Sequence, residues 1–156
     1  MEYLCQKYAL GDHWYPRDLR GRARVDEYTH WHHTFTRFHA ASLFRELLMS
    51  GEPNSQEVEK LERYNRKVTQ HLDKYYLKDH DFLCGNEISI ADILCICELT
   101  QLYAVGKESL YMDNPKVAKW VDRVKRACGP SFDESHKLIN RVRDSYLKRQ
   151  KTASKM

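Results

Sequence analysis

The stretch GNEISIADILCICEL, residues 85–99, decides how this chain is expected to fold. Ser89 is followed three residues later by Asp92, which fits a helix capping box with Asp in place of the usual Glu. In such a box the serine hydroxyl accepts from a free amide of the first turn, and the carboxylate accepts from the serine amide. Ile88 and Ile93 stand where a hydrophobic staple would pack across the cap. The pattern therefore predicts a helix that begins at Ser89.

The helix that follows this cap is apolar nearly all round, which is typical of a helix at the centre of a bundle. Its apolar residues are Ile90, Ile93, Leu94, Cys95, Ile96, Leu99 and Leu102. Cys95 and Cys97 would lie about 200° apart around the helix axis. Two such thiols cannot bind one metal ion, so we interpret the cysteines as core residues and expect no metal site.

The residues before the central helix also carry signals that start and stop helices. No segment alternates apolar and polar residues as a strand would. One long first helix is predicted from near Pro16 to the stop at Gly51, with a bend near Gly21. Asn54 and Glu57 form a plausible cap pair for the next helix.

Two further helices are predicted after the central one, the first from Asn114-Pro115 to Gly129-Pro130 and the last from Ser131. The residues expected to face inward are Val117, Trp120, Val121 and Val124, then Leu138, Ile139, Val142 and Tyr146. The sequence thus predicts an all-α bundle of about five to six helices, with a long first helix and a buried central helix starting at Ser89.

Composition indicates a soluble domain and gives no reason to expect nucleic acid or a membrane. The chain has 156 residues, of which 42% are hydrophobic and 31% charged, and no apolar run approaches the ~18 residues of a membrane span. The net charge of +4 arises from 26 basic and 22 acidic side chains that are interleaved, which is a mild excess. Five cysteines, an odd number, are typical of a reduced intracellular compartment.

The two ends of the chain are distinct from the bundle between them. Residues 1–10 read as the end of a helix stopped by Gly11, and residues 148–156 read as a basic, disordered tail. The tail ends in Ser154-Lys155-Met156, which resembles the peroxisomal Ser-Lys-Leu signal except at its last position. We expect a cytoplasmic location, with the peroxisome as the alternative.

Several motifs resemble the C-terminal domain of glutathione transferases. DFLCGNEISIADI (residues 81–93) is similar to the FLxGxxxSxADI motif that opens the core helix of that domain. The theta class is indicated by DHWYPRDLRGRARVDEY (12–28), WHHTFTR (31–37), CELTQL (97–102) and NPKVAKWVDRV (114–124). The resemblance extends from about Tyr3 to Leu147.

This resemblance implies that residues 11–147 are the helical domain and that residues 1–10 are a remnant of, or linker from, a thioredoxin-like domain. The implied function is conjugation of reduced glutathione to hydrophobic electrophiles, with an activating serine in that N-terminal domain and a homodimer as the full protein. Glutathione would be a co-substrate, and no cofactor is expected. We expect the chain to begin after the glutathione-binding domain and to be inactive alone. A non-catalytic helical module for binding or dimerisation is the alternative.

The family also implies site residues. The WxHTxxR match places Arg37 where a theta-type arginine reaches toward the glutathione thiol, and a solvated helix arginine is the alternative. Trp31, Phe35, Phe38 and Tyr103 are the candidates for the hydrophobic electrophile pocket, with core packing as the alternative. We expect no catalytic residue in this chain.

Four histidines of the same helix also invite a zinc hypothesis. They are His30, His32, His33 and His39. No pair has the i, i+4 spacing of a helical zinc site, so we interpret them as residues on the helix surface or facing another subunit.

Overall fold

The computed structural model describes residues 1–153, and all regular structure within them is helical, which confirms the predicted fold class. The helices are α1 (Glu2–Lys7), α2 (Leu19–Thr34), α3 (Thr36–Met49), α4 (Ser55–His71), α5 (Ile90–Ala104), α6 (Ser109–Met112), α7 (Pro115–Cys128) and α8 (Pro130–Ala153). A 3₁₀ turn covers Asp12–Trp14, and a π-helical turn covers Leu72–Tyr76 after α4.

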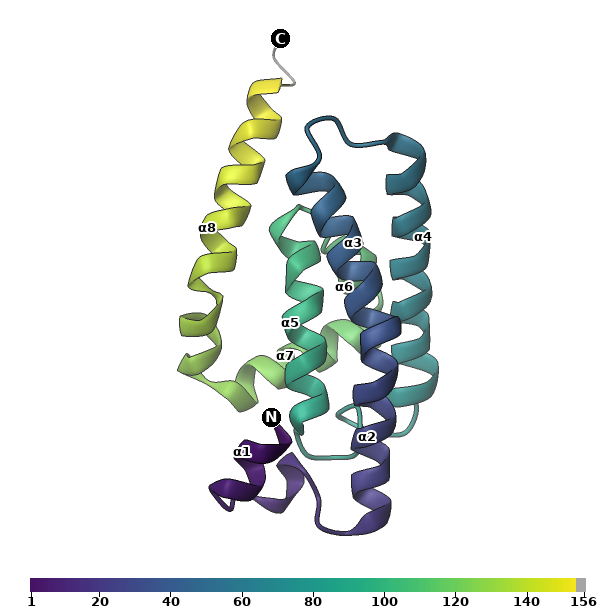
Figure 1. Ribbon diagram of the computed structural model, residues 1–156, viewed down its shortest axis with the longest axis vertical. Coiled ribbons are helices and arrows are strands. Elements are labelled where there is room, and N and C mark those ends of the chain that lie inside the picture. Colours follow the sequence, from purple (N-terminus) through teal and green to yellow (C-terminus); the bar gives the residue numbers. More distant parts are fainter. Residues whose placement is uncertain (154–156) are drawn as a thin grey trace.

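Helix α5 is the central element of the bundle, as predicted. It packs against α2 and α3 on one side and against α8 on the other, and α7 crosses it near one end (Figure 1). Helix α4 packs outside α3, and α1 lies at the end of the molecule where α5 begins. Within residues 1–153, no helix is long and apolar enough to cross a membrane.

The predicted cap of α5 is confirmed. The Ser89 hydroxyl accepts a hydrogen bond from the Ala91 amide at 3.3 Å, and Asp92 Oδ2 accepts one from the Ser89 amide at 2.9 Å. Ile88 is buried in the main core, and Ile93 packs against the same core. Local sequence therefore sets the start of the central helix.

Asp92 also joins three parts of the fold. Its second oxygen, Oδ1, accepts from the Leu83 amide at 2.9 Å and from the Trp120 indole N–H at 2.8 Å. The preceding loop, α5 and α7 therefore meet at one fully buried carboxylate. Burial raises the pKa of Asp92, and the hydrogen bonds from Leu83, Trp120 and Ser89 act in the opposite direction by stabilising the charged form.

The long first helix is present, but it is divided into α2 and α3 at Phe35 rather than bent at Gly21. Phe35 has φ −120° and ψ −80°, outside helical values, although its amide still bonds to the Trp31 carbonyl at 3.1 Å. Gly21 lies in the first turn of α2, which is capped by Asp18. A Cβ at position 21 would lie 3.1 Å from Pro16, so this glycine permits close packing at the helix start.

Asparagine caps start α4 and α7 where the sequence predicted them. The Asn54 side chain accepts hydrogen bonds from the backbone amides of Gln56 and Glu57 at 3.0 and 3.1 Å. At the start of α7, the Asn114 side chain accepts from the amides of Lys116 and Val117. The Glu57 side chain does not complete a capping box with Asn54. The Asn54 backbone amide donates instead to Glu46 Oε1 at 2.8 Å. The predicted inward stripe of α7 is buried throughout.

Helix α8 departs from the prediction in three ways. It begins at Pro130 rather than at a Ser131 cap, and it continues to Ala153, beyond the start of the expected tail at residue 148. Leu138 is 68% exposed, whereas Tyr146 is buried and Ile139 and Val142 are half-buried. Leu138 faces outward because only one side of this helix meets α5 and α7, and adjacent helical positions lie about 100° apart. The Ser154-Lys155-Met156 signal lies outside the described residues.

Candidate functional site

Arg37 lies in the first turn of α3, immediately after the break at Phe35. Its side chain is 60% exposed, and its Nε lies 3.9 Å from Glu98 Oε1 on α5. No hydrogen bond joins its terminal nitrogens to another group within residues 1–153. Arg37 therefore presents a largely exposed side chain whose guanidinium has one carboxylate near its Nε.

Glu98 is an acidic residue inside an otherwise apolar helix. Its side chain is 10% exposed, and its Oε2 accepts a hydrogen bond from the side-chain amide of Gln101, one turn later. Burial raises the pKa of Glu98, while Arg37, Gln101 and His33 favour the charged form. Arg37 is thus the principal positive partner of a carboxylate with few hydrogen bonds.

His32 lies beneath this pair and is 1% exposed, so the expectation that it faces the surface was wrong. Burial, with smaller contributions from His33 and Arg37, lowers the pKa of His32 to about 4. The imidazole is therefore neutral at pH 7, and its Nε2 lies 3.8 Å from Glu98 Oε1, too far for a hydrogen bond. This Nε2 is buried without a hydrogen-bond partner.

The three aromatic candidates on α2 and α3 differ in their surroundings. Trp31 is partly buried against the core. Its ring stacks on Phe35 with centroids 5.2 Å apart and contacts the His71 ring at a tilted angle with centroids 4.8 Å apart. Phe35 is 45% exposed and Phe38 58% exposed, so both present apolar surface to solvent. Both residues lie within two positions of Arg37 in the chain. Trp31 therefore packs as a core residue packs, while the two phenylalanines are free to meet another surface.

Tyr103, the fourth candidate, lines a different part of the molecule. It borders a cavity whose remaining walls come from α5, the α6 region, α7 and α8, and no residue of α2 or α3 lines that cavity. The Arg143 guanidinium lies 4.0 Å from the centre of the Tyr103 ring. The structure does not bring Tyr103 together with the other three aromatic residues.

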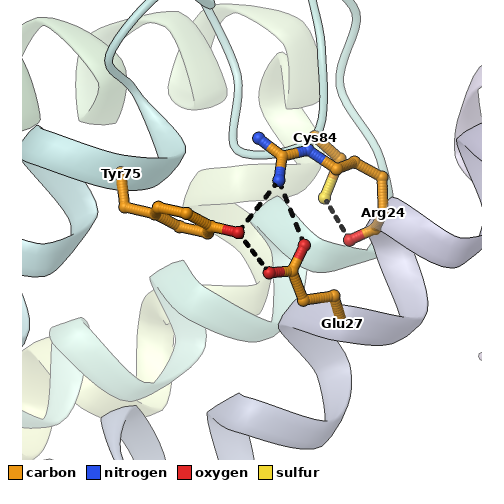
Figure 2. A network of polar contacts seen from close by, with 4 residues as sticks. All are labelled: Arg24, Glu27, Tyr75 and Cys84. Atoms are coloured by element: carbon orange, nitrogen blue, oxygen red, sulfur yellow. Dashed lines mark hydrogen bonds and ion pairs between the residues drawn. The ribbon is translucent and has the colours of Figure 1, made fainter.

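A second polar cluster joins α2 to the π-helical turn and is drawn in Figure 2. The Tyr75 hydroxyl donates to Glu27 at 2.5 Å, and the Arg24 guanidinium donates to Glu27 at 3.1 Å and to the Tyr75 oxygen at 3.4 Å. The Cys84 thiol donates to the Arg24 carbonyl at 3.5 Å. These contacts tie α2 to the π-helical turn and to the loop that carries Cys84, so we interpret the cluster as one that connects parts of the fold.

Burial disfavours the reactive thiolate form of the cysteines around α5. Burial raises the pKa of Cys84 to about 12 and also raises the pKa values of Cys95, Cys97 and Cys128. A protonated thiol is a poor nucleophile and a poor metal ligand. Within residues 1–153, no group of three His, Cys, Asp or Glu side chains is placed to hold a metal ion.

Glu98 and His32 were not identified from the sequence as site residues. Glu98 was detectable in principle, because a carboxylate in a helix that is apolar on all sides is costly to bury. It also lies in the CELTQL motif. For His32 the only sequence signal was its place in WHHTFTR, which does not say which of two adjacent histidines turns inward.

Comparisons with known proteins agree with this architecture. The sequence profile described as "Glutathione S-transferase, C-terminal domain" matches residues 31–127. Glutathione S-transferase theta-1 of Gallus gallus is 36% identical over 150 residues, which cover 91% of this chain and 56% of that protein.

Two solved structures show the same fold. Human glutathione-S-transferase T1-1 in its apo form is 36% identical, with a TM-score of 0.85 over 92% of this chain and 62% of that one. A human theta-class transferase in complex with the glutathione conjugate of 1-menaphthyl sulfate is 32% identical, with a TM-score of 0.86 over 96% of this chain and 63% of that one. The chain thus spans about three fifths of the length of these proteins. It belongs to the glutathione S-transferase family, matches that family's C-terminal helical domain and resembles the theta class.

Proposed function

We propose that this chain supplies the helical domain of a theta-type glutathione transferase, which joins the sulfur of reduced glutathione to a hydrophobic electrophile. The observation that carries this proposal is the solvent-facing guanidinium of Arg37 beside the buried Glu98. A human theta-class relative of the same fold was solved with a glutathione conjugate. That relative supports glutathione as the co-substrate here.

Arg37 would act on charge that develops at sulfur or on the leaving group. A guanidinium next to the thiol favours the thiolate, and it also stabilises an anion that departs from the electrophile. Glu98 Oε1 lies 3.9 Å from Nε, beyond hydrogen-bond distance, and the Arg37 side chain is largely exposed, so its guanidinium is accessible to a ligand. The exposed rings of Phe35 and Phe38 offer apolar surface for the electrophile.

The thiol itself must be activated by groups outside the residues described here. Burial raises the pKa of the thiols of Cys84 and Cys95, which disfavours their thiolate forms, so in the proposal the sulfur nucleophile comes from glutathione. In the proposal, a thioredoxin-like domain binds glutathione and provides the activating serine. Tyr3 is 66% exposed and Leu4 is 50% exposed, and this apolar surface of α1 is suited to contact such a domain.

Activity measurements on two proteins test the proposal. Residues 1–156 alone should not be retained on immobilised glutathione and should not conjugate 1-menaphthyl sulfate. The same residues joined to the N-terminal part of human T1-1 should conjugate it. In that fusion, Arg37→Ala should lower kcat/KM roughly tenfold to a hundredfold, because one preorganised charge at the reacting centre is lost.

Arg45→Ala is the matched control, since Arg45 is an exposed arginine of the same helix. It should leave kcat/KM unchanged. A folded fusion that is inactive with and without Arg37 would instead support the non-catalytic binding or dimerisation module. Measurement of the native mass against 18.6 kDa for one chain tests the homodimer that is part of the proposal. A cytoplasmic location also belongs to the proposal, and imaging of the tagged protein in cells would test it against the peroxisome.

A further inference from the structure

A cavity of about 370 Å³ lies between α5, the α6 region, α7 and α8. In Figure 1, α8 runs beside α5, and α7 leads from the lower end of α8 across the lower part of α5. The volume is within the usual range for small-molecule sites. Because α2 and α3 contribute nothing to its walls, this cavity is separate from the surface that carries Arg37.

One part of the cavity wall is formed by two stacked rings. The rings of Phe132 and His136, in the first turns of α8, stack with centroids 3.9 Å apart and an angle of 14° between their planes. Phe132 is buried, and the buried side chains of Ile96 and Val121 complete this wall. Such a surface is suited to an aromatic ring.

A second part of the wall carries a hydroxyl group that lacks a partner. Tyr111 lines the cavity and is 4% exposed, yet its hydroxyl makes no hydrogen bond within residues 1–153. The charged groups beside it are already used, because Arg143 donates to Glu108 at 3.1 Å and also to the Tyr103 carbonyl. Burial raises the pKa of Tyr111, so its hydroxyl remains a donor at neutral pH.

We propose that this cavity binds a small, uncharged aromatic molecule that carries a hydrogen-bond acceptor. The ring lies against Phe132 and His136, and the acceptor receives the hydroxyl proton of Tyr111. An uncharged ligand fits best because Glu108 is paired with Arg143 at one side, and Lys125 and Asp133 have opposite charges at the other. This site binds its ligand without glutathione.

Binding of two matched probes to residues 1–156 tests the proposal. 2-Acetylnaphthalene carries a carbonyl acceptor, and naphthalene has the ring system alone. Equilibrium dialysis should give saturable binding of one molecule per chain for both, with several-fold tighter binding of the ketone. Tyr111→Phe should weaken the ketone about fivefold to tenfold, the usual effect of one hydrogen bond, and leave naphthalene unchanged.

Two further variants locate the site. Asn140→Trp places a large ring at the exposed rim of the cavity and should abolish binding of both probes. Phe38→Ala removes an exposed ring from α3, outside the cavity, and should change neither affinity. Circular dichroism and melting curves check that each variant is folded.

Three results would overturn the proposal. One is the absence of saturable binding up to the solubility limit of the probes. Another is binding that survives Asn140→Trp but is lost in Phe38→Ala. The third is a Tyr111→Phe variant that binds both probes as the parent chain does.

Discussion

Helix α5 buries two carboxylates, and they differ in how completely the protein satisfies them. Asp92, at the start of the helix, accepts four hydrogen bonds, from the amides of Leu83 and Ser89, the Ser89 hydroxyl and the Trp120 indole. Glu98, nearly two turns later, accepts one hydrogen bond, from Gln101, and its contacts to Arg37 and His32 are 3.9 and 3.8 Å long.

The difference separates a residue that maintains the fold from one that is available for function. A buried carboxylate with all its acceptor positions occupied fixes the groups around it. One with few hydrogen bonds costs stability, and proteins tend to keep such groups at functional sites. Asp92 therefore belongs to the architecture of the bundle, and Glu98 belongs to the surface where we propose that glutathione chemistry takes place.

The largest effect is expected for Asp92→Ala. The substitution leaves the amides of Leu83 and Ser89 and the indole of Trp120 buried without an acceptor, so the free energy of unfolding should fall by on the order of 4 kcal/mol. Urea denaturation measures this change. Asp122→Ala, at an exposed aspartate of α7, should change the free energy by less than about 0.5 kcal/mol. A midpoint for Asp92→Ala equal to that of the parent would refute the structural role of the carboxylate.

A second test concerns how the stability of the protein depends on pH through His32, which lies beside Glu98. The folded protein holds the pKa of His32 at about 4, against an ordinary value of 6.5. As the pH falls from about 6.5 to about 4, the unfolded chain binds a proton that the folded chain does not, so stability is lost. The loss should reach at most about 3 kcal/mol. This loss of stability should be absent in His32→Gln, which urea titrations at each pH would measure. Equal acid sensitivity of the two proteins would show that His32 is not buried in its neutral form.

The helix starts could be predicted because their determinants are local. Ser89 with Asp92, Asn54 and Asn114 each act on amides within three residues, and the sequence displays such patterns directly. The break at Phe35 could not be predicted, since no glycine or proline marks it. Both halves of the segment pack against α5, but α3 also packs against α4, and that packing depends on residues far away in the chain.

The candidate site was predicted only in part for the same reason. Arg37 was identified through the family motif, but its neighbour Glu98 lies 61 positions further along the chain. Tyr103 was grouped with Trp31, Phe35 and Phe38 by residue type alone. Its position on the side of α5 that meets α8 depends on how α8 docks.

Trp120→Phe tests the role of Asp92 by removing one of its hydrogen-bond donors. The change removes the indole donor to Asp92 Oδ1 and leaves a small void, with an expected loss of about 2 kcal/mol in the free energy of unfolding. The double variant with Asp92→Ala should lose less than the sum of the two single changes, because both remove the same hydrogen bond. Strict additivity in urea denaturation would show that the two side chains do not interact.

The smallest effect on stability, and the sharpest contrast with Asp92, is expected for Glu98→Gln. Burial raises the pKa of Glu98 above its ordinary value of 4.5, so ionisation costs stability as the pH rises past that value. Glutamine removes this cost, and at pH 7 the variant should be as stable as the parent or more stable by about 1 kcal/mol. The advantage should disappear near pH 4, where the parent carboxyl is protonated.

Glu62→Gln provides the control, because Glu62 forms a partly buried ion pair with Lys107 at 2.5 Å. At pH 7 this variant should be no more stable than the parent, because it loses the ion pair. In the fusion with the N-terminal part of human T1-1, Glu98→Gln should raise the KM for glutathione, since Arg37 loses the carboxylate beside its Nε. If Glu98→Gln instead unfolds the protein as readily as Asp92→Ala does, both carboxylates serve the fold, and the distinction between them fails.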